Sequence, residues 1–279
     1  MPPQKVLTKD GSATLYSNRY RQHYHNISGA LTESHHVFFE RTGLTDALSK
    51  HHPITICETG FGTGLHLLML EYLRIALHSQ SAIRYFSVEK SPVAIDLIRE
   101  IDFPGQMALL YSKQTGGFLE EPTDFVPVLT AFFQLSRMLH SARTGNSISL
   151  TMPEFHGSQT EATIFRGDFF DWNLDYLIRS VDFFLHDAFS PAANPELWTS
   201  DTFSKLLTAA KPNAVLGTYC SATRARAAMI IAGWKVARTA GPPGKREMTL
   251  ASPSEEPLNG YKRVNEERLR DRFSGEKDL

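Results

Sequence analysis

The stretch ITICETGFGTGLHLLML, residues 54–70, decides the fold of this chain. Its first residues, Ile54 to Ile56, are β-branched and predict a buried strand, while the leucine-rich run that begins at Leu65 predicts a helix. Three glycines lie between them, in the segment 60–64. Glycine permits positive φ and a close backbone approach to a ligand, and the free N–H groups at the start of the helix point into the same space. We therefore predict a strand, a loop and a helix that form a pocket of the nucleotide-binding kind.

The glycine spacing narrows the choice of ligand. The dinucleotide fingerprint G-x-G-x-x-G would place its third glycine at position 65, which is Leu65, so a nicotinamide dehydrogenase is disfavoured. The pattern here is G-x-G-x-G, with an acid, Glu58, before it. This form resembles motif I of the class I S-adenosylmethionine (SAM) methyltransferases, although a purely structural glycine turn is the alternative. The candidate cofactor-binding residues of this stretch are Glu58, Gly60, Phe61, Gly62, Thr63 and Gly64.

Composition sets broad limits on what the chain is. Its 279 residues are 42% hydrophobic and 21% charged, enough for one large α/β domain or a domain with an insertion. We expect a cytoplasmic protein without a membrane span, since no apolar run reaches 18 residues and no signal peptide is evident. The formal net charge of −1 neither supports nor excludes an RNA substrate. The histidine doublets at 35–36 and 51–52 lack a third ligand at metal-site spacing, so we predict no metal.

Two further acids follow predicted strands. Glu89 ends the strand 83–88 and lies 25 residues after Gly64 (89 − 64), near the interval at which nucleotide-binding sheets place a ribose carboxylate. Asp168 follows the strand 162–165 and would bond the adenine amino group or cap a helix that starts near Phe169. Because ligands lie outside the carboxyl ends of parallel strands, we add Lys90, Asp168 and Phe169 to the cofactor candidates. For Glu89 the alternative is a solvated acid before a helix.

The fourth strand, 181–186, leads into DAFSPAANPELW, residues 187–198. Asp187 would face the methyl donor from the end of this strand, and two prolines stiffen the loop. A helix from Glu196 to about residue 210, a strand at 214–219 and a helix at 221–232 complete the alternation. The segments 234–238 and 247–251 predict a terminal β-hairpin.

The remaining segments divide the chain into three parts. Residues 1–50 form an N-terminal extension whose rings and basic groups fit either a cover for a sheet edge or a substrate cap. Residues 51–251 form the main domain, interrupted at about 102–160 by an insertion that contains an amphipathic helix over 123–142. Residues 252–279 read as a loose polar tail.

Four pieces in order, ETGFGTGL (58–65), Glu89-Lys90, HDAFSPAANPELW (186–198) and GKREM (244–248), carry a family resemblance. They resemble the tRNA 5-methylaminomethyl-2-thiouridine methyltransferases, the methyltransferase half of MnmC-type enzymes and their stand-alone relatives. The segment 29–38, with Glu33 in its acidic position, extends the resemblance.

The resemblance implies a Rossmann-like class I SAM methyltransferase fold, an α/β fold for which we expect a mostly parallel seven-stranded sheet with a C-terminal antiparallel hairpin. It implies conversion of 5-aminomethyl-2-thiouridine at the tRNA wobble position to 5-methylaminomethyl-2-thiouridine. The candidate substrate or tRNA contacts are Tyr24, Glu33, Arg224, Arg226, Lys245 and Arg246. The two arginines of the helix are two positions apart and do not share one face, and exposed basic turns are often simply solvated.

The sequence also departs from the family pattern. The chain ends at Leu279 without room for a flavin-dependent oxidoreductase domain, so we expect a stand-alone enzyme whose flavin step is absent or performed by a separate protein. A Val-Arg-Arg motif appears as Ala225-Arg226-Ala227, and His66 stands where the family often has asparagine.

The chemistry requires a neutral amine, since an alkylammonium has no lone pair with which to attack. A carboxylate that orients the amine and accepts its proton would help, and Asp187 is the candidate, with Phe189 and Pro191 shaping the slot. Alternatively, Asp187 holds the loop through bonds to backbone N–H groups. Other functions left open are methylation of a small-molecule or protein amine, and a non-catalytic SAM-binding partner of a flavoprotein.

Overall fold

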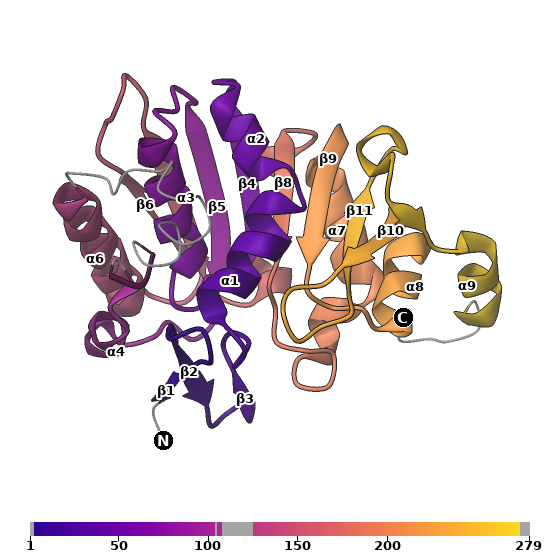
Figure 1. Cartoon of the computed structure of the whole chain (residues 1–279), viewed down its shortest axis with the longest axis horizontal. Helices are drawn as coiled ribbons and strands as arrows, with labels where there is room; N and C mark the ends of the chain where they lie inside the picture. The colour runs from indigo at the N-terminus through magenta and orange to yellow at the C-terminus, as the bar shows by residue number, and fades with distance from the viewer. Residues whose placement is uncertain (1–2, 104, 108–124, 274–279) are drawn as a thin grey trace.

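The computed structural model describes residues 3–103, 105–107 and 125–273. Its centre is a nine-stranded sheet with the order β12-β10-β11-β9-β8-β4-β5-β7-β6 (Figure 1). The strands are β4 (Ile54–Thr59), β5 (Ile83–Glu89), β6 (Asn146–Thr151), β7 (Thr160–Arg166), β8 (Val181–His186), β9 (Ala210–Thr218), β10 (Lys235–Ala240), β11 (Glu247–Ser252) and β12 (Lys262–Arg263).

The middle of the sheet is parallel and buried on both faces. Strands β7, β5, β4, β8 and β9 pair in parallel, and every residue of β4 is buried. Neighbouring residues of β4 serve different cores: Ile56 packs into the larger apolar cluster and Cys57 into the second one. A strand buried on both faces reads as a continuous apolar run, which is why Ile54 to Ile56 were recognisable in the sequence.

The two edges of the sheet are antiparallel. The expected hairpin is confirmed, with Ala240 of β10 opposite Glu247 of β11. The sheet has nine strands where we expected seven, because β6 adds antiparallel to β7 at one edge and the two-residue β12 adds to β10 at the other. The extra strands cover edges that would otherwise leave backbone groups unpaired.

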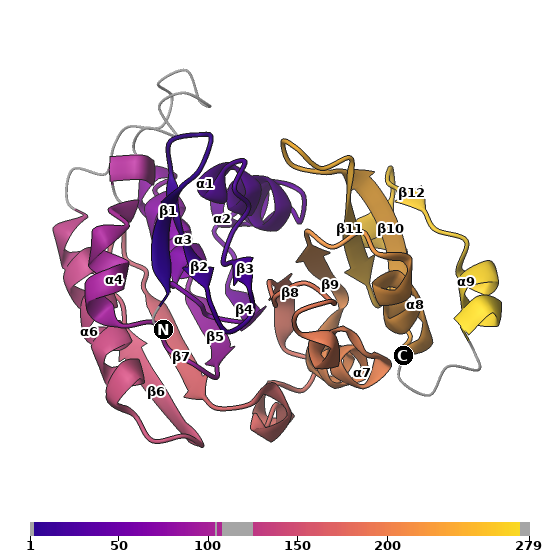
Figure 2. The same cartoon turned by 90° about the horizontal axis from the view of Figure 1, so that it is seen from below.

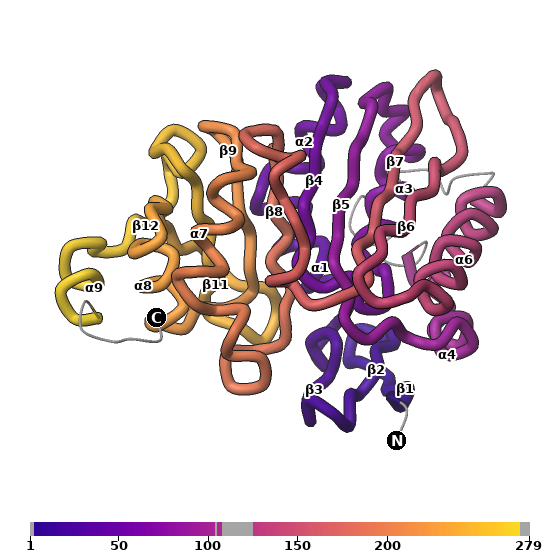
Figure 3. Tube along the Cα trace, turned by 180° about the vertical axis from the view of Figure 1, so that it is seen from behind, coloured from indigo at the N-terminus to yellow at the C-terminus, as the bar shows by residue number. Residues whose placement is uncertain are grey.

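Helices cover both faces of the sheet (Figures 1 and 2). One face carries α1 (Ala30–Ser34), the π-helical η1 (His35–Glu40), α2 (Leu44–Ser49), α3 (Leu65–Ala76), α4 (Ile95–Glu100) and α6 (Val126–Ser141). The other carries α7 (Ser200–Ala209) and α8 (Thr223–Ile231), which lie in front of the sheet in the reverse view (Figure 3). The inserted amphipathic helix predicted over 123–142 is therefore present as α6, although residues 123 and 124 lie outside the described residues.

Short 3₁₀ turns connect several of these elements. They are η2 (Phe169–Asp171), η3 (Asp175–Leu177), η4 (Pro195–Trp198) and η5 (Glu256–Leu258). Asp168 caps η2 by accepting a hydrogen bond from the backbone N–H of Phe170, as one of the two sequence interpretations anticipated. The helix expected from Glu196 is split into η4 and α7.

The N-terminal segment forms its own small sheet. Strands β1 (Gln4–Leu7), β2 (Ala13–Ser17) and β3 (Gln22–His23) pair in that order, all antiparallel. Figure 1 shows this sheet beneath the lower end of the main sheet, the end at which β9 terminates. The N-terminal segment therefore lies at the carboxyl ends of the parallel strands, where ligands of such sheets bind.

The segment after Ser252 differs from the expected loose tail. It carries η5, β12 and α9 (Glu266–Phe273), and α9 packs against α8 at the far right of Figure 1. Phe273 is buried in the second apolar cluster. The hydrophilic composition of this segment hid the few apolar anchors that fix it. In the described part of the chain, no helix is long and apolar enough to cross a membrane.

Candidate active site

The glycine loop joins β4 to α3 at the carboxyl end of the sheet. Gly60 has φ of +96°, and a Cβ on it would lie 3.4 Å from the backbone oxygen of Asp187. The loop and the strand β8 therefore approach each other most closely where no side chain intervenes. The backbone N–H of Gly62 donates to Glu89 Oε2 at 2.8 Å, which ties the loop to the end of β5.

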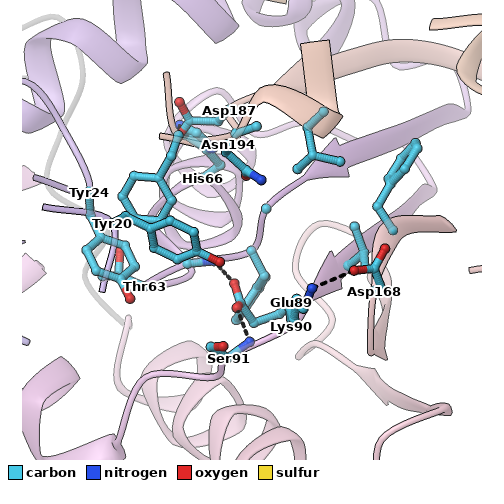
Figure 4. A pocket seen from close by; sticks show the side chains of 18 of the residues that line it. Tyr20, Tyr24, Thr63, His66, Glu89, Lys90, Ser91, Asp168, Asp187 and Asn194 are labelled. Carbon is cyan, nitrogen blue, oxygen red and sulfur yellow. Dashed lines mark hydrogen bonds and ion pairs between the residues drawn. The ribbon is translucent and has the colours of Figure 1, made fainter. Parts of the chain in front are cut away.

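A cavity with about 880 Å³ of unfilled space opens beside this loop (Figure 4). Many of the predicted site residues line it: Tyr24, Gly60, Phe61, Gly62, Thr63, Glu89, Lys90, Asp168, Phe169, Asp187 and Phe189. The same cavity is lined by residues that the sequence reading did not select, among them Tyr20, His25, His66, Ser91, Asn194, Glu196 and Leu197. We call it the first cavity. Its place at the carboxyl ends of the parallel strands is where such sheets bind their ligands.

Glu89 lies at the floor of the first cavity. Its carboxylate accepts hydrogen bonds from the backbone N–H groups of Gly62, at 2.8 Å, and Ser91, at 2.6 Å. Burial raises the pKa of Glu89, although these backbone bonds oppose the effect. A buried carboxylate held in this way is fixed in position and retains lone pairs for ligand hydroxyl groups.

Lys90 and Asp168 form an ion pair at the rim of the same cavity (Figure 4). The Lys90 Nζ atom lies 2.7 Å from Asp168 Oδ2, and the hydrogen bond from Lys90 lowers the pKa of the Asp168 carboxyl group. Asp168 is therefore ionised at neutral pH and is oriented by two contacts, the lysine and the N–H of Phe170. Lys90 is half exposed, so the pair can adjust when a ligand arrives.

Thr63 offers an unused polar atom to the first cavity. Its side chain is 1% exposed and lines the cavity, yet its Oγ1 has no hydrogen-bond partner. A buried hydroxyl without a partner costs free energy unless a ligand or water satisfies it. This atom therefore indicates that the cavity is built for a polar ligand.

Two predicted cofactor residues lie behind the cavity instead of in it. Gly64 begins α3 and packs against Phe132 of α6. Glu58 is 1% exposed and accepts hydrogen bonds from Ser87 Oγ at 2.8 Å and from the Tyr85 hydroxyl, and it bonds His66 at 2.6 Å. Three of the four predicted acids thus line the cavity, while Glu58 supports it from beneath.

Asp187 lies where β8 ends, beside the glycine loop. Its backbone N–H donates to the Thr59 carbonyl at 3.2 Å. Burial raises the pKa of its carboxyl group to about 8, because desolvation and the charges of Glu33 and Glu58 outweigh the opposing charges of His66 and Lys245. A group with a pKa in this range can exchange a proton near neutral pH.

Backbone contacts hold the loop that follows Asp187. The Tyr219 hydroxyl donates to the Ala188 carbonyl at 2.8 Å, and Trp198 Nε1 donates to the Phe189 carbonyl at 2.7 Å. Ser190 donates to the Gln22 side chain at 3.0 Å, which links the loop to the N-terminal sheet. None of these bonds uses the Asp187 carboxylate. They therefore do not support the interpretation in which that carboxylate holds the loop in place.

A second cavity adjoins the first and has about 670 Å³ of unfilled space. Both are lined by Tyr24, His25, Asp187, Ala188 and Phe189. The second cavity is completed by residues from both ends of the chain, among them Gln22, His23, Glu33, Ser34, Tyr219 and Lys245. Tyr24, Glu33 and Lys245, which the sequence proposed as substrate contacts, therefore meet in one place.

Glu33 and Lys245 form an ion pair within the second cavity. Lys245 Nζ lies 2.6 Å from Glu33 Oε1 and 4.1 Å from the centre of the Tyr219 ring. Glu33 also accepts a hydrogen bond from the backbone N–H of Asn26 at 3.0 Å. Rings of Tyr24 and Phe189 stand at 5.2 Å in an edge-on contact at the boundary of the two cavities.

Four other predicted residues, Pro191, Arg224, Arg226 and Arg246, lie outside both cavities. Arg226 is a correction: it is 8% exposed and bonds Thr249, Glu247 and the Met248 carbonyl, so it joins α8 to β11 and does not face outward. Pro191 is also a correction, because it borders a separate groove beside Trp198 and Arg224 and does not shape the slot next to Asp187. Arg246 is exposed and lines a shallow depression with Arg238 and Lys262.

Sequence reasoning missed the residues whose positions depend on long-range contacts. Tyr20 stacks on Phe189 with ring centres 4.3 Å apart, a contact across 169 positions (189 − 20) that no local pattern reveals. The sequence pointed to His66 only by its place two residues after the glycine loop, and its partners come from three other elements. Among the described residues, no group of three or more potential metal ligands gathers.

The glycine loop, the carboxylate at the end of β5 and the cavity at the carboxyl edge of the sheet have the arrangement of SAM-dependent methyltransferases with a Rossmann-like fold, the class of protein to which this chain is similar. The sequence model of a family described as "S-adenosyl-L-methionine-dependent methyltransferase" matches residues 132–254. S-adenosyl-L-methionine is accordingly the cofactor. The unpartnered Thr63 hydroxyl and the carboxylates of Glu89 and Asp168 fit a polar molecule that carries hydroxyl groups.

Relatives narrow this class further. The chain is 31% identical, over 251 residues, to the tRNA 5-methylaminomethyl-2-thiouridine biosynthesis bifunctional protein MnmC of Cupriavidus metallidurans, an alignment that covers 90% of this chain and 34% of that protein. The MnmC protein of Ralstonia nicotianae is 31% identical over 247 residues, covering 88% and 34%. The chain thus spans about a third of the length of these curated relatives.

A solved structure shares the fold. The crystal structure of MNMC2 from Aquifex aeolicus superposes with a TM-score of 0.63, covering 98% of this chain and 75% of that one at 21% identity. The resemblance to the methyltransferase domain of MnmC-type enzymes, predicted from four short motifs, is confirmed.

Proposed function

We propose that this chain methylates the aminomethyl nitrogen of 5-aminomethyl-2-thiouridine in tRNA, with S-adenosyl-L-methionine as methyl donor. The proposal draws on the MnmC relatives and on one structural observation that carries it. Two cavities meet at Asp187, one suited to the cofactor and one lined by rings and charged groups. A transfer between two ligands needs such a junction.

In this proposal the first cavity holds the cofactor. Glu89 would accept hydrogen bonds from the ribose hydroxyls and Asp168 from the adenine amino group, while Phe169 and the glycine loop would bind the adenosine. Thr63 Oγ1 gains a polar partner from the ligand. When bound, S-adenosyl-L-methionine would supply a methyl group on a positively charged sulfur: a neutral amine nitrogen would form the new N–C bond, and the C–S bond would break with its electron pair kept by S-adenosylhomocysteine.

The second cavity holds the modified base. Aromatic rings there, Tyr24, Phe189 and Tyr219, provide faces on which a flipped-out base can stack, the usual mode for single-stranded RNA bases. The carboxylates of Asp187 and Glu33 suit a substituent that carries an ammonium group. Recognition of a small cationic arm on an aromatic ring follows from this combination.

Asp187 prepares the amine for attack. The substrate arrives mostly as an ammonium ion, so one N–H bond must break, leaving the electron pair on nitrogen and the proton on a base. The Asp187 carboxylate at the junction of the two cavities is the base in this proposal. The surrounding rings of Tyr24 and Phe189 exclude water and fix the approach of the nitrogen.

The tRNA backbone contacts are proposed at exposed cations outside the cavities. Arg224, beside the groove at Pro191, and Arg246, beside Arg238 and Lys262, are the candidates. Such contacts would contribute affinity that falls with salt. We further propose that a separate flavin-dependent oxidoreductase supplies the aminomethyl precursor.

The test is transfer of labelled methyl from S-adenosyl-L-methionine to tRNA. We expect labelling of tRNA that carries 5-aminomethyl-2-thiouridine and none of fully modified tRNA from the same cells. Nucleoside analysis of the product should place the label on the 5-methylaminomethyl group. Equal labelling of unrelated amines, or of both tRNA pools, would contradict the proposal.

A further inference from the structure

A buried chain of polar groups runs beneath the junction of the two cavities. His66, on the first turn of α3, is 2% exposed. Its Nδ1 lies 2.6 Å from Glu58 Oε1, and its Nε2 lies 3.1 Å from Ser34 Oγ and 3.9 Å from Asp187 Oδ2. Four elements, β4, α3, α1 and the loop after β8, thus converge on one imidazole. Figure 4 shows His66 and Asp187 next to each other at one end of the first cavity.

Glu58 fixes this imidazole in orientation. The carboxylate is held by Ser87 and Tyr85 on β5, so it remains in place whatever occupies the cavities. The rings of Phe38 and Phe39 pack against the imidazole with centres 4.5 and 6.4 Å away. A histidine that lies between two carboxylates and is enclosed by rings has little freedom to turn. Its Nε2 atom lies on the side of Ser34 and Asp187.

The charges around His66 favour its protonated form. Burial disfavours the imidazolium, but the hydrogen bond and charge of Glu58, with the charges of Asp187 and Glu33, outweigh burial and raise the pKa of His66. The other titratable neighbours are His25, which burial keeps neutral with a pKa of about 3, and Tyr85, whose pKa is also raised by burial. His66 is therefore the cation that balances the acids on this side of the cavity, while Lys245 faces Asp187 from the loop between β10 and β11.

We propose that His66 is a positioning residue for methyl transfer: its imidazolium, anchored by Glu58, lies 3.9 Å from Asp187 beneath the junction and favours the ionised form of that carboxylate, the form that takes a proton from the substrate ammonium. The proton moves from nitrogen to an Asp187 oxygen, and the freed electron pair stays on nitrogen. Glu58 and His66 keep the same protonation state before and after the step. The proposal rests on the proposed function for its substrate but not for its electrostatics.

The electrostatic part can be measured without RNA. In protein labelled with ¹³C at the aspartate carboxyl carbon, with Asp187 assigned through Asp187→Asn, the Asp187 signal should titrate near pH 8 in the native protein. In His66→Asn the midpoint should rise by about 1 pH unit or more, since an opposite charge at this distance shifts a carboxyl group by that much. Ser34→Ala is the matched control: it removes a bond to the same imidazole but leaves its charge, so the Asp187 midpoint should stay where it was.

The kinetic part uses undermodified tRNA. His66→Asn should lower kcat at pH 7 by about tenfold and recover most of it at pH 9, because one pH unit changes the ionised fraction by about that factor. A structural defect would lower the rate at both values of pH. An unchanged Asp187 midpoint in His66→Asn would overturn the inference. So would a wild-type His66 that is neutral at pH 7, which ¹⁵N imidazole shifts report even if the variant fails to fold.

The two proposals fail in different ways. If tRNA is not methylated but the Asp187 midpoint moves as expected, the arrangement of His66 stands and the substrate is another amine. If tRNA is methylated but the midpoint does not move, the proposed function stands and His66 has only a packing role.

Discussion

At the scale of single residues, Asp187 connects the burial of a carboxyl group to a pH-dependent activity. Its pKa is raised to about 8, so the neutral acid predominates below that value and the carboxylate above it. About a tenth of the groups are ionised at pH 7 and about nine tenths at pH 9. Because the ionised form is the one that accepts a proton, we expect kcat for tRNA methylation to rise over this interval with a midpoint near 8. A pH profile of single-turnover rates, where chemistry is the observed step, measures it.

The substitution Asp187→Asn tests the same residue directly. The amide keeps the shape but cannot take a proton, so kcat should fall by roughly 10²- to 10⁴-fold, the range of general-base catalysis. Affinity for S-adenosylhomocysteine, measured by calorimetry, should change little. Asp182→Asn is the control, since Asp182 lies on β8, the strand that Asp187 follows, and pairs with Lys211 away from both cavities. Full activity in Asp187→Asn would exclude a base at this position.

Residues that follow predicted strands were the easiest to place from sequence. Glu89, Asp168 and Asp187 line the first cavity because parallel strands deliver their carboxyl ends to one edge, a local rule. Glu58 and Arg226 escaped that rule. Each has its charge satisfied by partners from other elements, Tyr85 and Ser87 for Glu58 and Glu247 for Arg226, and such partners become visible only once the strands are in register.

At the scale of elements, the inserted helix α6 packs against the glycine loop at Gly64. A Cβ on Gly64 would lie 2.5 Å from Phe132 Cε2 of α6, and Gly64 has φ of +77°. Gly64→Ala therefore adds a steric clash to backbone strain and should lower the free energy of unfolding by roughly 2–4 kcal/mol. Chemical denaturation followed by circular dichroism measures the loss.

Gly145→Ala is the matched control for that prediction. Gly145 has φ of +92° but no atom within 4 Å of its Cβ position, so the substitution should cost only the strain, about 1 kcal/mol. The double variant Gly64→Ala, Phe132→Leu should recover part of the loss, since the smaller side chain makes room. Equal losses in the two alanine variants would mean that α6 does not press on the loop.

Elements were predictable to different degrees for a physical reason. The apolar spacing of α6 is a property of its own sequence, so the helix could be predicted, but its packing against α3 could not. The added edge strand β12 depends on its pairing partner, with Lys262 opposite Arg238. Pairing of this kind is non-local, and a polar strand such as β12 gives no alternating pattern to detect.

At the scale of the whole molecule, the second cavity forms where the N-terminal segment meets the loop between β10 and β11. Glu33 on α1 and Lys245 in the loop between β10 and β11 are 212 positions apart and form an ion pair. Both line the second cavity, and neither is among the lining residues of the first. The sequence pointed to both residues as substrate contacts only through the family resemblance, since no local pattern could bring them together.

This separation of the cavities leads to a distinct expectation for Lys245→Met. The methionine keeps most of the apolar stem but not the charge, so Glu33 loses its cation and the wall of the second cavity loosens. The KM for tRNA should rise by roughly 5- to 30-fold, equivalent to about 1–2 kcal/mol for one charge-assisted contact, while the dissociation constant of S-adenosylhomocysteine stays nearly the same. Steady-state kinetics gives the KM, and calorimetry gives the dissociation constant.

Lys211→Met, which breaks the ion pair with Asp182 away from both cavities, should change neither the KM nor the dissociation constant. A loss of S-adenosylhomocysteine affinity in Lys245→Met would contradict the separation of the two cavities. Lys245 lines only the second cavity, so it has no direct contact through which to lower the affinity of the first cavity for its ligand.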